Sequence, residues 1–191
     1  MKRLTTVAIA AFLSIASSAH AAGITFIFEG SGRATLDTSS FFAVFTITTT
    51  ADTADITSFG SGNAVDNATA SIDIQGVGVF DIITPTRVFA NTDNNTVGFS
   101  RSSGADLFNI TDNAFAGFDL TQSIGPVDSL GQLLQWDSGD VMTTGGVLFF
   151  ESFQTDARFT AIVDSEVPVP AAALLFGPAL AGFMAWRRKR S

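Results

Sequence analysis

The chain has 191 residues, 46% of them hydrophobic, and a net charge of −8, but the segment 22–166 alone carries −14, from four arginines against eighteen acidic residues. Because a segment this acidic repels phosphate backbones, nucleic acid is excluded as a partner. The same segment contains no Cys, His, Lys or Tyr, which excludes Ser-His or Cys-His nucleophile pairs, thiolate or imidazole metal sites and Schiff-base lysines.

The first 21 residues have the three regions of a secretory signal peptide. A positively charged start precedes a mostly apolar stretch over 4–15, and Ala19 and Ala21 form the small-x-small pattern that signal peptidase recognises. An amphipathic first helix of the domain is the alternative, but the apolar stretch has no polar face. We therefore expect export, with signal peptidase cutting after Ala21 and leaving Ala22 as the new N-terminus.

The segment 22–166 follows as short apolar-polar alternations that are interrupted by Gly, Asn, Asp and Ser, a pattern typical of strands. The alternation predicts strands at 24–29, 33–36, 41–50, 68–74, 78–83, 87–90, 96–101, 107–111, 115–120, 147–153 and 158–163. Only 129–136 suggests one or two helical turns. Regular short strands separated by turns predict an all-β fold, namely a single jelly-roll-like β-sandwich domain.

Phenylalanine dominates the aromatic residues, with 19 Phe and no Tyr in the chain. Most of these rings alternate with Thr, Ser or Asp, as in 41–50, and such alternation buries one face of a strand and exposes the other. We therefore expect the Phe side chains to form the core rather than a ligand platform. Since the chain has no Cys, that core has to hold the exported domain together without disulfides.

Turns rich in Asp and Asn are the candidate metal sites. Asp93 and Asn95 belong to one such turn, and Asp137 and Asp140 belong to another. Oxygen side chains at alternate positions are typical of calcium loops, although neither turn has the Gly and the distant Glu of an EF-hand. Asp and Asn also favour turns because they bond to their own backbone. Calcium is thus the one candidate cofactor, with plain turn structure as the alternative.

Catalysis would depend on carboxylates. A glycosidase needs two carboxyl groups roughly 5–10 Å apart. Glu29 and Glu151 are the only glutamates in predicted strands, and no hydrolase signature surrounds either. We therefore expect no catalytic residues and no enzyme activity, with a carboxylate glycosidase as the remotest alternative.

The segment 167–191 is a three-part tail. It opens with Val167-Pro168-Val169-Pro170-Ala171, continues without charge to Trp186, and ends in Arg187, Arg188, Lys189 and Arg190. The stretch 171–186 predicts a transmembrane helix of about 24 Å, which is short for a hydrocarbon core of roughly 30 Å. Basic residues are retained on the cytoplasmic side, so we expect the domain to lie outside.

This tail resembles the PEP-CTERM sorting signal, and more closely its VPLPA-type variant, with Val169 where the name-giving motif has Glu. The resemblance implies recognition by an exosortase, a membrane transpeptidase-like protease, with the basic end 187–190 acting as stop-transfer signal. It also implies a Gram-negative bacterium that makes exopolysaccharide, and transient anchoring in the inner membrane. The recognition box that it implies consists of Val167, Pro168, Pro170 and Ala171.

Together these features predict a non-catalytic, exported protein of the cell surface or matrix, associated with extracellular polysaccharide. The alternative is a carbohydrate-binding module on the same sandwich, assisted by calcium, with Trp136 as a stacking ring. A glycosidase that uses Glu29 and Glu151 is the third hypothesis.

Overall fold

The computed structural model describes residues 22–164, and these residues form one β domain. The all-β prediction is confirmed, since the domain consists of strands joined by turns and three short 3-10 segments. Within the described range, no helix is long and apolar enough to cross a membrane. The predicted signal peptide at 1–21 and the predicted sorting tail at 167–191 lie outside the described residues.

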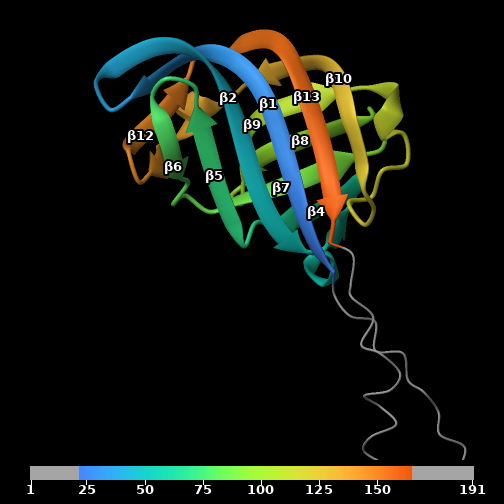
Figure 1. Ribbon diagram of the computed structural model, residues 1–191. Helices are drawn as coiled ribbons and strands as arrows, with labels where there is room; N and C mark the ends of the chain where they lie inside the picture. The colour runs from blue at the N-terminus through green and yellow to red at the C-terminus, as the bar shows by residue number, and fades with distance from the viewer. Residues whose placement is uncertain (1–21, 165–191) are drawn as a thin grey trace, which may run out of the picture.

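The strands carry the labels of Figure 1. They are β1 (Gly23–Leu36), β2 (Ser39–Asp52), β3 (Thr57–Phe59), β4 (Gly62–Asp66), β5 (Thr69–Ile74), β6 (Gly78–Asp81), β7 (Thr86–Asn91), β8 (Thr96–Arg101), β9 (Asp106–Thr111), β10 (Ile124–Leu133), β11 (Val141–Thr143), β12 (Gly146–Phe150) and β13 (Phe153–Val163). The 3-10 segments are η1 (Thr53–Asp55), η2 (Asn113–Phe115) and η3 (Trp136–Ser138).

All the strands belong to one antiparallel sheet. Its order is β3-β4-β7-β8-β9-β10-β13-β1-β2-β5-β6, and β12 attaches β11 to the end of β1. The sheet curls so that β5, β2, β1 and β13 lie side by side in one layer, with β7, β8 and β9 behind them (Figure 1). The finer prediction of a jelly-roll-like sandwich is not confirmed, because one continuous hydrogen-bonded path forms both layers.

The space enclosed by the curl is filled with Phe rings, as predicted. The ring of Phe28 on β1 lies 4.9 Å from that of Phe159 on β13 and 6.2 Å from that of Phe99 on β8, centroid to centroid. All three side chains are fully buried. Phe42, Phe59 and Phe153 are exceptions, with 63%, 42% and 48% of their surface exposed. Aromatic contacts, which favour tilted and edge-on geometry, therefore help to join the two layers, together with the buried aliphatic side chains.

β1 runs without a break through two glycines, where the alternation predicts separate strands at 24–29 and 33–36. Gly30 and Gly32 both face the core. A Cβ on Gly30 would lie 2.9 Å from the Phe108 ring, and a Cβ on Gly32 would lie 2.6 Å from Leu133. These glycines therefore make room for core side chains within a strand, rather than ending it.

Two predictions for the segment 115–136 are wrong. Residues 115–120 form no strand, because η2 ends at Phe115 and the loop after it has positive φ at Gly117 and Leu120, 75° and 71°. Most of the suggested helical turns at 129–136 are strand β10, which is flanked by β9 and β13. The short strands β3, β4 and β11, with three to five residues each, give no alternation long enough to predict them.

The two ends of the described domain lie side by side. Ile24 near the start of β1 pairs with Val163 at the end of β13, and the N–H of Asp164 donates to the carbonyl of Gly23 at 2.8 Å. Figure 1 shows β1 beginning where β13 ends. The chain therefore enters and leaves the domain at one pole, which we call the terminal pole.

Gly131 on β10 provides a test of the packing between β10, β13 and β9. A Cβ at this position would lie 2.6 Å from both the Ala157 Cβ and the Phe108 ring. We expect Gly131→Ala to lower the free energy of unfolding by about 1–3 kcal/mol through overpacking, as measured by chemical denaturation. The control is Gly60→Ala, where no atom lies within 4 Å of the added Cβ. Equal stability of the two variants would contradict this packing.

Candidate functional site

The loop after β10, in which Asp137 and Asp140 are candidate calcium ligands, is organised around Arg101. Only 6% of the Arg101 surface is exposed. Its guanidinium donates to the carbonyls of Gln135 at 3.1 Å, Trp136 at 3.2 Å and Gly139, and to Ser138 Oγ at 2.6 Å. Three backbone carbonyls and one hydroxyl of this loop are therefore already hydrogen-bonded to the Arg101 guanidinium.

The two carboxylates of this loop also act on Arg101. Burial lowers the pKa of the Arg101 guanidinium, and the negative charges of Asp137 and Asp140 partly oppose that shift. An arginine stays charged under such conditions, because its ordinary pKa is above about 12. Across residues 22–164, no three His, Cys, Asp or Glu side chains form a group that could hold a metal ion.

The other candidate calcium residues, Asp93 and Asn95, lie in the turn between β7 and β8. The N–H of Asp93 donates to Oδ1 of Asn91 at 3.0 Å, and Asn95 adopts a φ of 52°. Both features are typical of Asx-type turns. The turn lies at the start of β8 and Arg101 lies at the end of β8. At 3.3 Å per residue the two are about 20 Å apart. The structure does not bring the two candidate pairs together.

The prediction that Trp136 is an exposed stacking ring is wrong. The side chain is 1% exposed, and its Nε1 donates to the carbonyl of Leu107 at 2.8 Å. Its ring packs edge-on against Phe150, with centroids 4.8 Å apart. Trp136 is therefore a core residue with its one polar atom hydrogen-bonded, as buried tryptophans require.

Glu29 and Glu151 lie in two separate ion pairs. Glu29 contacts Arg158 at 3.9 Å and Glu151 contacts Arg33 at 3.5 Å. The N–H of Glu151 bonds the carbonyl of Arg33. Arg33 lies four residues along β1 from Glu29, or about 13 Å. The two carboxylates thus face different arginines rather than a shared substrate position.

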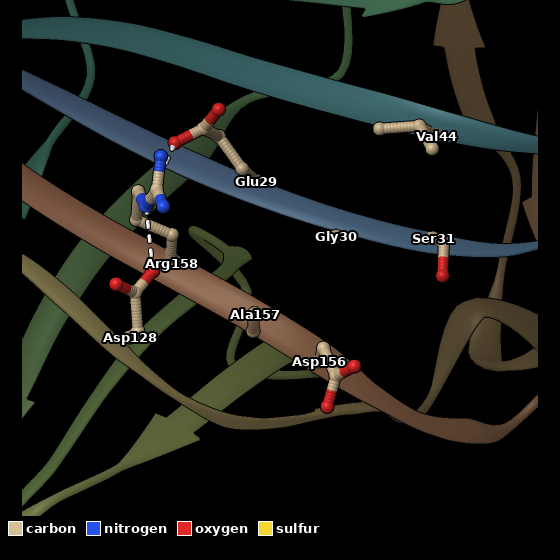
Figure 2. Close-up of a pocket in the computed structure, with 8 residues that line it drawn as sticks. All are labelled: Glu29, Gly30, Ser31, Val44, Asp128, Asp156, Ala157 and Arg158. Atoms are coloured by element: carbon tan, nitrogen blue, oxygen red, sulfur yellow. Dashed lines mark hydrogen bonds and ion pairs between the residues drawn. The ribbon is translucent and has the colours of Figure 1, made fainter.

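A shallow hollow of about 280 Å³ opens on the outer face of β10, β13, β1 and β2. Arg158 lies at one end, bonded to Asp128 at 2.6 Å and close to Glu29, whereas Ser31 and Val44 line the other end (Figure 2). The hydrogen bond and charge of Asp128, followed by the charge of Glu29, raise the pKa of Arg158. The guanidinium is therefore engaged by two carboxylates, and the hollow carries a net negative charge, since Glu29, Asp128 and Asp156 outnumber Arg158.

A second hollow of about 410 Å³ opens on the outer face of β8, β9, β10 and β13. Gln132 on β10 pairs directly with Gln154 on β13 and with Asn109 on β9. Directly paired residues point to the same face of a sheet. Asn109, Gln132 and Gln154 therefore form a line across three strands, which we call the amide row. The hollow is lined by Asn94, Thr96, Asn109, Thr111, Leu130, Gly131, Gln132 and Gln154.

The amide row differs from end to end in its exposure. Gln132 and Gln154 are exposed, whereas Asn109 is half-buried and donates through Nδ2 to Oδ2 of Asp106 at 3.1 Å. The Oδ1 of Asn109 is buried without a hydrogen-bond donor among the described residues. Asp106 therefore fixes the orientation of one amide, while the two glutamines are free to meet solvent or a ligand.

Leu130 lies beside the amide row and connects the two hollows. It is 56% exposed, and its neighbours across the strands are Thr111 and Asp156. Asp156 also lines the first hollow. The sequence does show polar residues at outward strand positions, but the amide row was missed because β10 was not predicted as a strand.

Comparison of the chain with protein-family models, curated proteins and solved structures finds no match. The exposed amides and hydroxyls of the second hollow can donate hydrogen bonds to a polar molecule and accept them from it, and Leu130 adds an apolar contact.

The buried position of Arg101 makes a stability prediction. We expect Arg101→Met to lower the free energy of unfolding by about 1.5–3 kcal/mol, because loop oxygens lose hydrogen bonds to a charged group. Arg33→Met is the control: Arg33 contacts Glu151 at the surface, with 65% of its side chain exposed, and exposed pairs contribute about 0–1 kcal/mol. Chemical denaturation measures both, and similar losses would show that Arg101 does not organise the loop.

Proposed function

We propose that this chain is an exported protein of a Gram-negative bacterium, sorted by its C-terminal tail and held at the cell surface or in extracellular polysaccharide, where its β domain acts without catalysis. The observation that carries this proposal is the three-part tail at 167–191, together with the signal-peptide pattern at 1–21. The terminal pole, at which Ile24 pairs with Val163, brings the two ends of the domain to one side. A domain that follows a signal peptide and precedes a membrane tail is then tethered from one pole, and its outer face stays accessible.

The spacing between the domain and the proposed recognition box agrees with this arrangement. The described domain ends at Asp164 and the box begins at Val167, three residues later. Three extended residues span at most about 11 Å. Before processing, a box this close to the folded domain would place the terminal pole near the membrane, and an exosortase would cut just below it.

A carbohydrate-binding module is the second candidate function, and the hollow along the amide row favours it. In the loop of Asp137 and Asp140, the Arg101 guanidinium already bonds the carbonyls of Gln135 and Trp136 and the hydroxyl of Ser138, which weighs against calcium there. The turn of Asp93 and Asn95 stays the candidate for calcium assistance. The geometry does not favour the glycosidase hypothesis, because Glu29 and Glu151 pair with different arginines rather than facing one substrate position.

Mass spectrometry of the native surface protein tests the sorting proposal. We expect an N-terminus at Ala22 and a C-terminus within 168–171. Changing Pro168 and Pro170 together to Ala should keep the chain uncut, because a rigid box that an exosortase recognises would be lost. Pro85→Ala, an exposed proline outside the box, should be processed normally.

Two outcomes would count against the proposal in different ways. A surface form that still ends at Ser191 would make the tail a plain membrane anchor. Retention of an intact signal peptide on a protein confined to the cytoplasm would exclude export altogether.

A further inference from the structure

We propose that the amide row and Leu130 form a binding site for a neutral glycan chain. This inference rests on the proposed surface function, and it assigns one site and one class of sugar to it. The hollow of about 410 Å³ is the feature that contains these side chains.

The hydrogen-bonding chemistry of the amide row suits sugar hydroxyls. Each amide offers a carbonyl acceptor and an NH2 donor, and each sugar hydroxyl can donate and accept. Directly paired strand residues hold their Cβ atoms about 4.5–5.5 Å apart, so the row presents the same pair of groups repeatedly along a line. A repeated line of contacts fits an extended oligosaccharide better than a single small molecule.

Leu130 and Thr111 supply the remaining contacts that a sugar needs. Leu130 is a half-exposed apolar side chain directly beside the row, and it pairs across the sheet with Thr111. The ring C–H face of a hexose can cover such a side chain, and removal of that area from water is favourable at about 25 cal/mol per Å². An apolar centre with a few placed polar groups is the usual composition of a ligand site.

The charges around the hollow select against anionic sugars. Asp156 is the cross-strand neighbour of Leu130, and Asp106 holds Asn109. Arg158 on β13 is bonded to Asp128, and Arg87 on β7 donates to the hydroxyl of Ser100. Because like charges raise the free energy of binding, uronate, sulfate and phosphate groups are disfavoured here and a neutral chain is preferred.

A peptide that adds a strand to the sheet is a poorer occupant. That mode of binding requires an edge strand with free backbone groups. β10 and β13 are both interior strands, since β10 lies between β9 and β13 and β13 lies between β10 and β1. A ligand on this face therefore contacts side chains rather than the backbone.

Affinity electrophoresis of the purified full-length chain tests the site, with dextran, galactomannan and laminarin as neutral probes and alginate as the polyuronate probe. We expect at least one neutral polymer to retard the wild type, and alginate to bind more weakly. The double variant Gln132→Ala with Gln154→Ala should weaken binding about tenfold or more, because two hydrogen-bonding side chains are lost.

The matched control is Gln75→Ala, which removes an exposed amide outside the amide row, on the loop after β5. It should bind like the wild type. Leu130→Ser should weaken binding without changing the denaturation midpoint, which separates a binding defect from a folding defect.

Three results would overturn the site: no retardation by any neutral probe, undiminished binding by the double variant, or tighter binding of alginate than of the neutral polymers. Undiminished binding by the double variant would leave the surface association with polysaccharide intact and reject only the amide row. Failure of export in the mass spectrometry experiment would reject the proposed surface function whatever the glycan result.

Discussion

The pairing of β1 with three other strands is the constraint on which the domain depends. β1 pairs with β2 along its whole length, with β13 over its first half and with β12 at its end. Every second residue from Ile24 to Ala34 is buried. Because a slip of one residue would turn that buried set to solvent, the register is strongly specified. The change of partner occurs around Gly30 and Gly32, where the absence of side chains lets Phe108 and Leu133 pack against the strand.

The register that buries the core residues also determines which residues point to the outer face of the sheet. On β13, Ala157 and Phe159 point inward, so that Gln154, Asp156 and Arg158 point outward. Each outward residue is then paired with a fixed residue on β10, and β10 is in turn paired in fixed register with β9. The amide row is thus a consequence of two strand pairings, which fix the positions from which its side chains project.

The scarcity of cations explains much of the surface chemistry. The described domain has four arginines, and three of them are engaged by acidic groups or loop oxygens: Arg33 by Glu151, Arg158 by Asp128 and Glu29, and Arg101 by the loop after β10. The fourth, Arg87, donates to Ser100 at 3.1 Å. An acidic surface of this kind repels polyanions. The negative charges of Asp137 and Asp140, which suggest calcium from sequence alone, also act on the pKa of Arg101 and partly oppose its lowering by burial.

The sequence by itself determined the all-β class, the Phe core and the absence of thiol, imidazole and amine chemistry between residues 22 and 166. It did so because alternation and composition are local properties. Only the tertiary structure decided that Trp136 is buried, that β1 continues through its glycines, and that Asn109, Gln132 and Gln154 share one hollow. The physical reason is that alternation specifies which face a residue occupies, whereas the neighbouring strand is chosen by contacts between residues far apart in the chain.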